Sequence, residues 1–506
     1  MRQMADTVLD FEKLSDADRA KIEDRIRETL GDDPVEYQAV APVLQQKFKK
    51  MSYWDLAMIW FGANIIIATW AVGALATTVF GLDPVGAIIS IAIGNLMGSL
   101  MLAATSAMGR NGNPQPMFSI PIFGYKGAKI PNFLLCFTTL GWTTANTVLS
   151  SLAIFALIKI FAPSAGSVVK VMIVLAITAV CVLVASNKFI VARNVEKYAA
   201  YLMMAFLVVL SYFCIKDTNW AGAASEFTGQ NSFSYIMMFL SAAGAIGIGY
   251  IGTWSPYGAD YARYVNMEKW DRQKKVFWWS LAGGFAVSTW MECVGALFAY
   301  MYKTFDPALH VVKTIPSFAI PALIIMIAGA LATVVLNYLS VGVQLKALGV
   351  KVGRRACTWI VSIIVFILAL YSVLFTDISH TYHAFLVALL IWVVPWVVMQ
   401  IMDYYIITKG NYSVLALYGI EKIYPDYDWR GLGTLIAGFI FSGAFAYAGN
   451  MKLFGVIPLY SPIMEKYFYC GDISYFVGGV VTFILYWFLK VKPNNEMLKD
   501  NMPVGG

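Results

Sequence analysis

Long apolar runs separated by short connectors make up most of the chain after a polar start of fifty residues. A helix needs about 20 apolar residues to cross the hydrocarbon core of a bilayer. Runs of that length recur from residue 56 onward and predict an all-α integral membrane protein with about twelve transmembrane helices. The expected spans are Leu56–Val79, Val85–Met108, Ile130–Phe161, Val168–Ala185, Ala199–Ile215, Phe233–Tyr257, Val276–Tyr302, Ile315–Leu345, Thr358–Phe375, Tyr382–Ile407, Leu432–Ala448 and Ile473–Leu489.

Two of these spans carry residues that interrupt a helix. The sixth runs through AIGIGYIGTWSPYGADYARYV, which is rich in glycine and contains Pro256. The first contains WFGANIIIATWAVGALA, in which Gly62 and Asn64 precede a β-branched run. Unwound backbone at membrane depth is tolerated only beside protein or a water-filled cavity. Interrupted helices at corresponding positions of two halves mark a transport site, and these two lie five spans apart.

Composition and charge agree with a membrane protein. Hydrophobic residues make up 59% of the 506 positions and charged residues only 13%, about half the charged fraction of soluble domains. The net charge of +7 comes from basic residues in alternate connectors, which the positive-inside rule places in the cytoplasm. We therefore expect a multi-pass protein of the cell inner (plasma) membrane with both termini cytoplasmic, and no nucleic-acid partner.

Residues 1–50 differ from the rest of the chain. The stretch DFEKLSDADRAKIEDRIRETLGDDP is acidic and favours a helix, and it has no apolar core like that of a signal peptide. A gate or regulatory role is open, but a solvated cytoplasmic tail is the preferred interpretation. The six cysteines show no paired spacing, so neither a disulfide framework nor a zinc site is expected.

Charged and amide side chains inside the spans are the candidates for chemistry. Glu292 is the carboxylate expected nearest the middle of a span, and it is interpreted equally well as a proton carrier or as a structural hydrogen-bonding group. Asp403 falls near a helix end and is expected to be a packing or gate residue. Trp142 and Asn146 lie four residues apart, so one helix face offers a flat ring and an amide. Asn337 is an amide in an otherwise apolar span and must meet another helix or a ligand.

Four segments resemble the nucleobase:cation symporter family, particularly its purine and cytosine permease branch. They are TWSPYGADYARYV in the sixth span, WFGANI in the first, GNPQPMFSIPIFGYKGAKIPNFLLCFTTLGWTTANT leading into the third, and VVPWVVMQIMDYYIITKGNY in the tenth. The similarity covers residues 54–412. It implies a leucine-transporter-like fold of two inverted repeats, residues 51–217 and 218–410, followed by two peripheral helices in 411–490 and a cytoplasmic tail over 491–506.

The resemblance also implies a site for a planar base between the first, third, sixth and eighth spans. In this sequence the substrate-binding positions would be Trp142, Asn146, Asn337, Tyr250, Ile251 and Asn64. Two departures matter. Ile251 stands where relatives commonly have an aromatic, and Leu331 and Ala332 stand where sodium-coupled members have hydroxyls.

The second departure bears on which ion is coupled to transport. Sodium needs oxygen ligands, and only Thr333, with carbonyls near Ala63 and Ile66, could supply them. The residues therefore favour a proton, with Glu292 as its carrier, and leave sodium open.

The leading hypothesis is secondary active import of a nucleobase or a related heterocycle, coupled to H⁺ or Na⁺ and needing no cofactor. Thiamine-like or pyridoxine-like vitamins and hydantoin or allantoin are alternative substrates. A membrane-embedded enzyme is disfavoured, because the three histidines, His310, His380 and His383, lack acidic or thiolate partners in sequence. No Walker phosphate loop is present, which argues against an ATP-driven pump. A passive channel or a transporter-like receptor is the remaining class.

Overall fold

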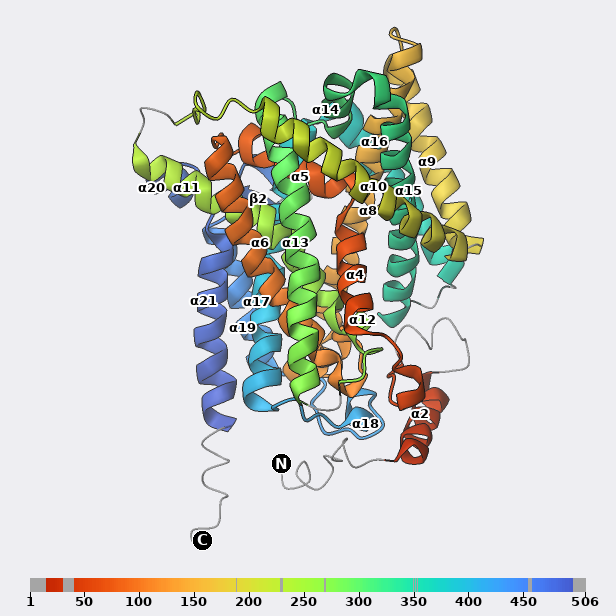
Figure 1. Ribbon diagram of the computed structural model, residues 1–506. Helices are drawn as coiled ribbons and strands as arrows, with labels where there is room; N and C mark the ends of the chain where they lie inside the picture. The colour runs from red at the N-terminus through yellow and green to blue at the C-terminus, as the bar shows by residue number, and fades with distance from the viewer. Residues whose placement is uncertain are drawn as a thin grey trace.

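The computed structural model describes residues 15–30, 41–187, 189–227, 231–267, 270–348, 350, 352, 354–453 and 457–494. The apolar runs fold into long helices that stand side by side across the height of the molecule (Figure 1). Helices of the first half are α4 (Tyr53–Asn64), α5 (Ile67–Thr78), α6 (Pro84–Ala107), α8 (Lys129–Phe161), α9 (Ser167–Asn187) and α10 (Phe189–Asp217). Those of the second half are α11 (Ser232–Ala242), η4 (Ala243–Ile248), η5 (Ile251–Tyr257), α12 (Gly258–Ala262), α13 (Trp270–Tyr302), α15 (Ala319–Ala347), α16 (Arg354–Phe375), α17 (Ile378–Met402), η7 (Asp403–Ile407), α19 (Trp429–Ala444), α21 (Ser474–Tyr486) and η8 (Trp487–Val491).

Short elements cap the two ends of this bundle. One end carries α2 (Asp16–Leu30) and α18 (Val414–Leu417), and the opposite end carries α14 (Pro307–Thr314) (Figure 1). We call these the α2 end and the α14 end. The other short elements are η1 (Gln46–Phe48), η2 (Met108–Asn111), η3 (Gln115–Ser119), α7 (Ile120–Phe123), η6 (Pro316–Phe318), α20 (Pro462–Tyr467), β1 (Tyr447–Leu453) and β2 (Ile457–Tyr460).

The described residues contain eleven of the about twelve expected spans, judged by length and composition. Among the described residues, ten helices are long and apolar enough to cross a membrane, and the bent pair α4 and α5 makes an eleventh span. The run expected as Leu432–Ala448 forms α19, which has only 16 residues. The last residues of the expected run instead begin the antiparallel hairpin of β1 and β2. The apolar composition of this stretch did not indicate a hairpin.

Glycines allow the helices around the broken spans to approach at backbone distance. A Cβ atom on Gly247 would lie 1.9 Å from the carbonyl carbon of Gly94, so η4 and α6 touch through their main chains. A Cβ atom on Gly73 of α5 would lie 2.0 Å from the carbonyl oxygen of Glu292 in α13. Small residues at such contacts let membrane helices gain van der Waals packing that larger side chains would prevent. The bundle of α5, α6, η4 and α13 is therefore tightly fixed.

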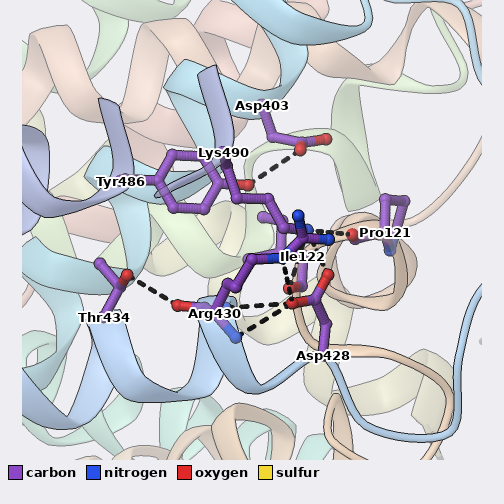
Figure 2. A network of polar contacts seen from close by, with 9 residues as sticks. Pro121, Ile122, Asp403, Asp428, Arg430, Thr434, Tyr486 and Lys490 are labelled. Atoms are coloured by element: carbon purple, nitrogen blue, oxygen red, sulfur yellow. Dashed lines mark hydrogen bonds and ion pairs between the residues drawn. The ribbon is translucent and has the colours of Figure 1, made fainter. Parts of the chain in front are cut away.

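A polar network fastens the peripheral helices to the rest of the α2 end (Figure 2). Asp428 caps α19, and its carboxylate pairs with Lys490 at 2.7 Å. Burial alone would raise the pKa of Asp428, but the Lys490 ammonium and hydrogen bonds outweigh it and hold that pKa below its usual value. Lys490 also donates to the carbonyl of Pro121 at 3.0 Å. Asp403 accepts hydrogen bonds from Tyr486 at 2.9 Å and from Tyr412 at 2.8 Å, as expected of a packing residue.

The described part of the N-terminal region is packed rather than solvated. Ile22 and Ile26 of α2 are buried in an apolar cluster that also contains Leu44, Met108 and Tyr404. One face of α2 and most of residues 41–50 are therefore packed against the bundle, whereas the interpretation of this region as a tail expected full solvation. Among the described side chains of α2, Arg19, Ile22 and Ile26 are the buried ones, and only two of them are apolar, so the apolar face gave a weak signal in the sequence.

We predict that Gly247→Ala destabilises the fold by at least about 1–3 kcal/mol, because the added methyl group would overlap the backbone of Gly94. Thermal unfolding of the purified protein in detergent measures the change. The control is Gly433→Ala in α19, where no atom lies within 4 Å of the new Cβ; alanine should be neutral or slightly stabilising there. Equal melting temperatures for Gly247→Ala and the parent would contradict the backbone contact.

Candidate functional site

The first span breaks between Asn64 and Ile67. Helix α4 ends at Asn64, Ile65 and Ile66 adopt non-helical conformations, and α5 starts at a bend of 62°. Ile66 is fully extended, with φ −131° and ψ 163°. The interruption expected from Gly62 and Asn64 is confirmed at this point. Backbone groups at the break lose their helical partners, so side chains must replace them.

The sixth span is irregular without being unwound. It changes from α-helix to π-helix over Ala243–Ile248 and to 3₁₀-helix over Ile251–Tyr257. Tyr250 joins these two segments with φ −100° and ψ −79°. A π-helical turn within a helix is frequent at functional sites. The predicted interruption is therefore present, but it is a change of helix type that keeps the chain on a helical course.

Side chains from the third, sixth and tenth spans form an aromatic cluster beside the break. The Trp142 ring meets Tyr250, Tyr382 and Phe385 edge to face, with ring centroids 5.4, 6.1 and 5.1 Å away. Trp142 itself is only partly buried. We call Trp142, Tyr250, Tyr382 and Phe385 the aromatic cluster. Tyr382 and Phe385 were not predicted, because aromatics in an apolar span are usually packing residues.

Hydroxyl groups of Thr69 and of the aromatic cluster form hydrogen bonds beside the break in the first span. The Thr69 hydroxyl donates to the carbonyl of Asn64 at 2.6 Å and also contacts the Tyr250 hydroxyl. Tyr382 donates to the carbonyl of Ala68 at 3.3 Å. The first span is thus joined to the sixth through the hydroxyls of Thr69 and Tyr250 and to the tenth through Tyr382.

The side chain of Asn64 forms hydrogen bonds within the protein. Its amide donates to the carbonyl of Trp60 at 2.7 Å, and its side-chain oxygen accepts from the indole N–H of Trp254 at 3.0 Å. Both functional groups of Asn64 therefore have protein partners. Asn64 joins the first span to the sixth through Trp254.

Ile251 is oriented away from the aromatic cluster. Its Cγ2 atom lies against Gly98 of α6 and its Cδ1 atom lies close to Gly284 of α13. The side chain is completely buried between these helices. Of the two adjacent residues expected to close the other face of a ring, only Tyr250 reaches Trp142.

Two amides complete the polar part of the site. Asn146 donates to the carbonyl of Trp142 at 2.9 Å, while its side-chain oxygen is buried without a partner in the described part of the chain. Asn337 is partly exposed, and no hydrogen bond of its amide occurs among the described residues. Asn337 lies seven residues, or about two turns, after Ala330 and the same number before Gln344. Ala330 belongs to the central apolar cluster, and Gln344 contacts the sixth span. Asn337 is therefore on the face of α15 that packs toward the site.

A second polar pair lies between α6 and α13. The amide of Asn95 donates to Glu292 at 2.6 Å, and both side chains are fully buried. The other oxygens, Oε1 of Glu292 and Oδ1 of Asn95, have no partner among the described residues. The pair thus has more acceptors than donors, which a proton or a cation would correct. Asn95 was not singled out in the sequence, although a lone amide in an apolar span is the same signal that selected Asn337.

The residues expected to bind sodium are less well arranged. The Thr333 hydroxyl donates to the carbonyl of Gly329 at 3.0 Å, within its own helix. The carbonyl of Ile66 accepts from the backbone N–H groups of Thr69 and Trp70. Ala63 is the last residue but one of α4. No hydrogen bond links Thr333 to the break in the described structure.

His310 takes a structural position. His310 accepts from the indole N–H of Trp70 at 3.1 Å and faces the carbonyl of Thr304 at 2.7 Å. Burial lowers the pKa of His310 to about 4, so the ring is neutral and donates its remaining N–H to Thr304. In the part of the chain that the structure describes, no three His, Cys, Asp or Glu side chains are grouped to hold a metal ion.

Comparisons with known proteins agree on the kind of molecule. A family model described as permease for cytosine/purines, uracil, thiamine and allantoin matches residues 42–478. The putative purine-cytosine permease YxlA of Bacillus subtilis is 27% identical over 456 residues, which is 87% of this chain and 92% of that protein. The allantoin permease of the same organism is 25% identical over 480 residues, covering 88% of this chain and 91% of that protein.

A solved structure shares the fold. It is Mhp1, a nucleobase-cation-symport-1 family transporter, in a closed conformation with bromovinylhydantoin bound, and its TM-score is 0.66 at 16% sequence identity. The match covers 94% of this chain and 98% of Mhp1. The expected leucine-transporter-like fold is thereby confirmed.

We predict that Trp142→Leu weakens binding of a planar heterocycle about 10-fold to 100-fold, since a base stacked on an aromatic ring gains about 1–3 kcal/mol. Binding of labelled cytosine and adenine to the purified protein measures the effect. The matched control is Trp279→Leu, because Trp279 is exposed on α13 and packs edge to face on Trp54. Unchanged affinity in Trp142→Leu would remove the indole from the binding site.

Proposed function

We propose that this chain, which belongs to the family of permeases for cytosine/purines, uracil, thiamine and allantoin, imports a cytosine-like or purine-like base by alternating access. It is a multi-pass integral membrane protein and a secondary transporter of nucleobase-like substrates. The observation that supports the finer proposal is the aromatic cluster at the break of the first span, with the unpartnered oxygen of Asn146 one turn from Trp142.

The chemistry of the site suits a flat ring with polar edges. Trp142 offers a partly exposed aromatic surface, and Tyr250 approaches it from the sixth span. Asn146 supplies a buried acceptor for a ring N–H or an exocyclic amino group. Asn337 supplies both a donor and an acceptor from α15. Buried polar groups that stay unpaired without the ligand give such a site its selectivity.

We place the α2 end in the cytoplasm of the cell. Exposed Lys274 and Lys275 begin α13 at this end, and exposed Lys50 precedes α4. Basic residues next to the ends of spans are retained on the cytoplasmic side. With this orientation, a substrate enters from the α14 end and leaves toward α2.

We propose a proton as the coupling ion, carried by the pair of Glu292 and Asn95. The pair is fully buried and contains two unpartnered oxygens, so protonation of the acid adds the donor that it lacks. An ionised carboxylate in this place would have Asn95 as its one donor, which compensates a buried charge poorly. The backbone of Glu292 lies against Gly73 of α5, six residues after the start of that helix, which connects the acid to the first span.

Uptake into proteoliposomes tests the proposal as a whole. Labelled cytosine, adenine, hypoxanthine, uracil, hydantoin, allantoin and thiamine are compared under an inward proton gradient and under an inward sodium gradient. We expect accumulation of a base that collapses when the proton gradient is dissipated. Equilibration without accumulation would favour a passive pathway, and accumulation of thiamine or allantoin alone would move the substrate to the alternative class. Failure of every compound under both gradients would refute the proposed function.

We predict that Asn337→Ala lowers the apparent affinity for the base at least about 10-fold, because it leaves part of a buried polar edge unpaired. Initial uptake rates over a range of substrate concentrations give the affinity. The control is Asn132→Ala, which removes an amide from α8 fourteen residues before Asn146, or about 21 Å along the helix. An unchanged affinity in Asn337→Ala would place the eighth span outside the binding site.

We predict that Glu292→Gln abolishes the dependence of uptake on the proton gradient and flattens its pH profile. Parent uptake should fall as the external pH rises, because fewer protons are available to occupy the acid. The glutamine keeps the shape and a hydrogen bond to Asn95 but cannot exchange a proton. Uptake at external pH 5 to 8 measures the profile, with Asp271→Asn at the exposed start of the same helix as the control. A pH profile identical to that of the parent would assign Glu292 a packing role.

A further inference from the structure

Helix α2 is attached to residues 41–51 by a specific set of polar contacts. The Glu23 carboxylate accepts the backbone N–H groups of Leu44 at 2.7 Å and of Gln45 at 3.2 Å. Arg19, itself buried, donates to the carbonyl of Leu44 at 3.3 Å. Ile26 lies beneath them with no exposed surface. These contacts fix the direction of the helix, because they involve backbone groups at a defined place.

Residues 41–51 are in turn bound to the ends of the second and sixth spans. Arg263, which follows α12, donates to the carbonyl of Ala41 at 2.7 Å. The backbone N–H of Met51 donates to the carbonyl of Tyr264 at 3.1 Å. The backbone N–H of Val43 donates to the carbonyl of Gly112 at 2.8 Å. The segment, which includes the short helix η1, is therefore held against the α2 end of the bundle along its length.

The position of Gly112 shows how closely this segment is seated. Gly112 has φ +75°, and a Cβ atom there would lie 2.1 Å from the carbonyl oxygen of Val43. A glycine is thus required both by the backbone conformation and by the passing chain. Helix α4, the first half of the broken span, begins at Tyr53, two residues after Met51. The segment thus ends where α4 begins.

The same end of the sixth span is also joined to α8 and α15. Tyr257, the last residue of η5, shares a hydrogen bond of 2.6 Å with Thr139 of α8 and accepts one of 3.3 Å from Gln344 of α15. Cys136 lies one turn before Thr139 and is 5% exposed. We take the route of a substrate from the aromatic cluster toward α2 to run between the sixth span and α8, in which case the contacts of Tyr257 must separate.

We propose that α2 and residues 41–51 form a latch that holds the α2 ends of the first and sixth spans in the closed arrangement. The latch binds the chain just after the sixth span and just before the first, which are the two broken spans. Release of the latch frees both ends together and favours opening toward the α2 end. The inference rests on the proposed function, because it takes this end as the side on which the substrate leaves.

Cys136 is a native reporter of this opening. The other five cysteines are replaced by alanine, and the rate at which a maleimide modifies Cys136 is measured in purified protein without substrate. In Ile26→Asp, a charge on the buried face of α2 should displace the latch and raise the rate at least about 5-fold. The matched control is Ala17→Asp, because Ala17 is exposed on the same helix; its rate should equal that of the parent.

A second cysteine separates opening from unfolding. Cys214 is fully buried on α10, where its thiol contacts the carbonyl of Val294. In a protein that keeps Cys214 alone, Ile26→Asp should leave this thiol protected. If Cys214 is also modified, Glu23→Ala takes the place of Ile26→Asp, since it removes the hydrogen bonds to Leu44 and Gln45 and leaves the apolar contacts in place.

Two results distinguish this inference from the proposed function. If a substitution in α2 leaves Cys214 protected and also leaves the rate of Cys136 modification at the parent value, the latch is overturned. This outcome does not depend on what the protein transports. Faster Cys136 modification in a protein that accumulates none of the tested heterocycles retains the latch and refutes the proposed substrate class. Both measurements use the full chain.

Discussion

A helix that breaks inside a membrane leaves backbone groups that water cannot reach, and the protein has to satisfy them. In this chain the carbonyls around the break of the first span are taken by side chains: Asn64 binds that of Trp60, Thr69 binds that of Asn64, and Tyr382 binds that of Ala68. Thr69 also contacts Tyr250, which belongs to the aromatic cluster. The groups that stabilise the break are therefore the groups around the proposed binding site, so a ligand there acts directly on the spans that must move.

The close backbone contacts explain how such motion could be transmitted. Gly73 joins the first span to Glu292, and Gly247 joins the sixth span to the second. Because these contacts admit no side-chain adjustment, α5, η4, α6 and α13 should move as one body. By contrast, the sixth span meets α8 and α15 through side chains: Tyr257 shares one hydrogen bond with Thr139 and accepts one from Gln344, and Tyr250 packs edge to face on Trp142. The molecule thus contains a stiff unit and a separable contact, as alternating access requires.

The sequence predicted the membrane class, the family and the two interrupted spans, because length, glycine and proline act locally. It did not predict contacts that depend on helix rotation. Ile251 follows Tyr250 by one residue, yet its side chain lies against Gly98 of α6 while Tyr250 reaches Trp142 of α8. Tyr382 and Phe385 resemble packing residues until Trp142 is seen beside them. The buried face of α2 was hidden by its charged surface.

The account depends on a flat heterocycle binding against Trp142 at the break of the first span. The most direct measurement is an experimental structure of the protein with the bound base, in lipid and at saturating concentration. The account predicts ring density against the indole of Trp142, with a polar edge within hydrogen-bonding distance of the Asn146 side-chain oxygen. Density for the base elsewhere in the molecule, with the aromatic cluster unchanged, would contradict it.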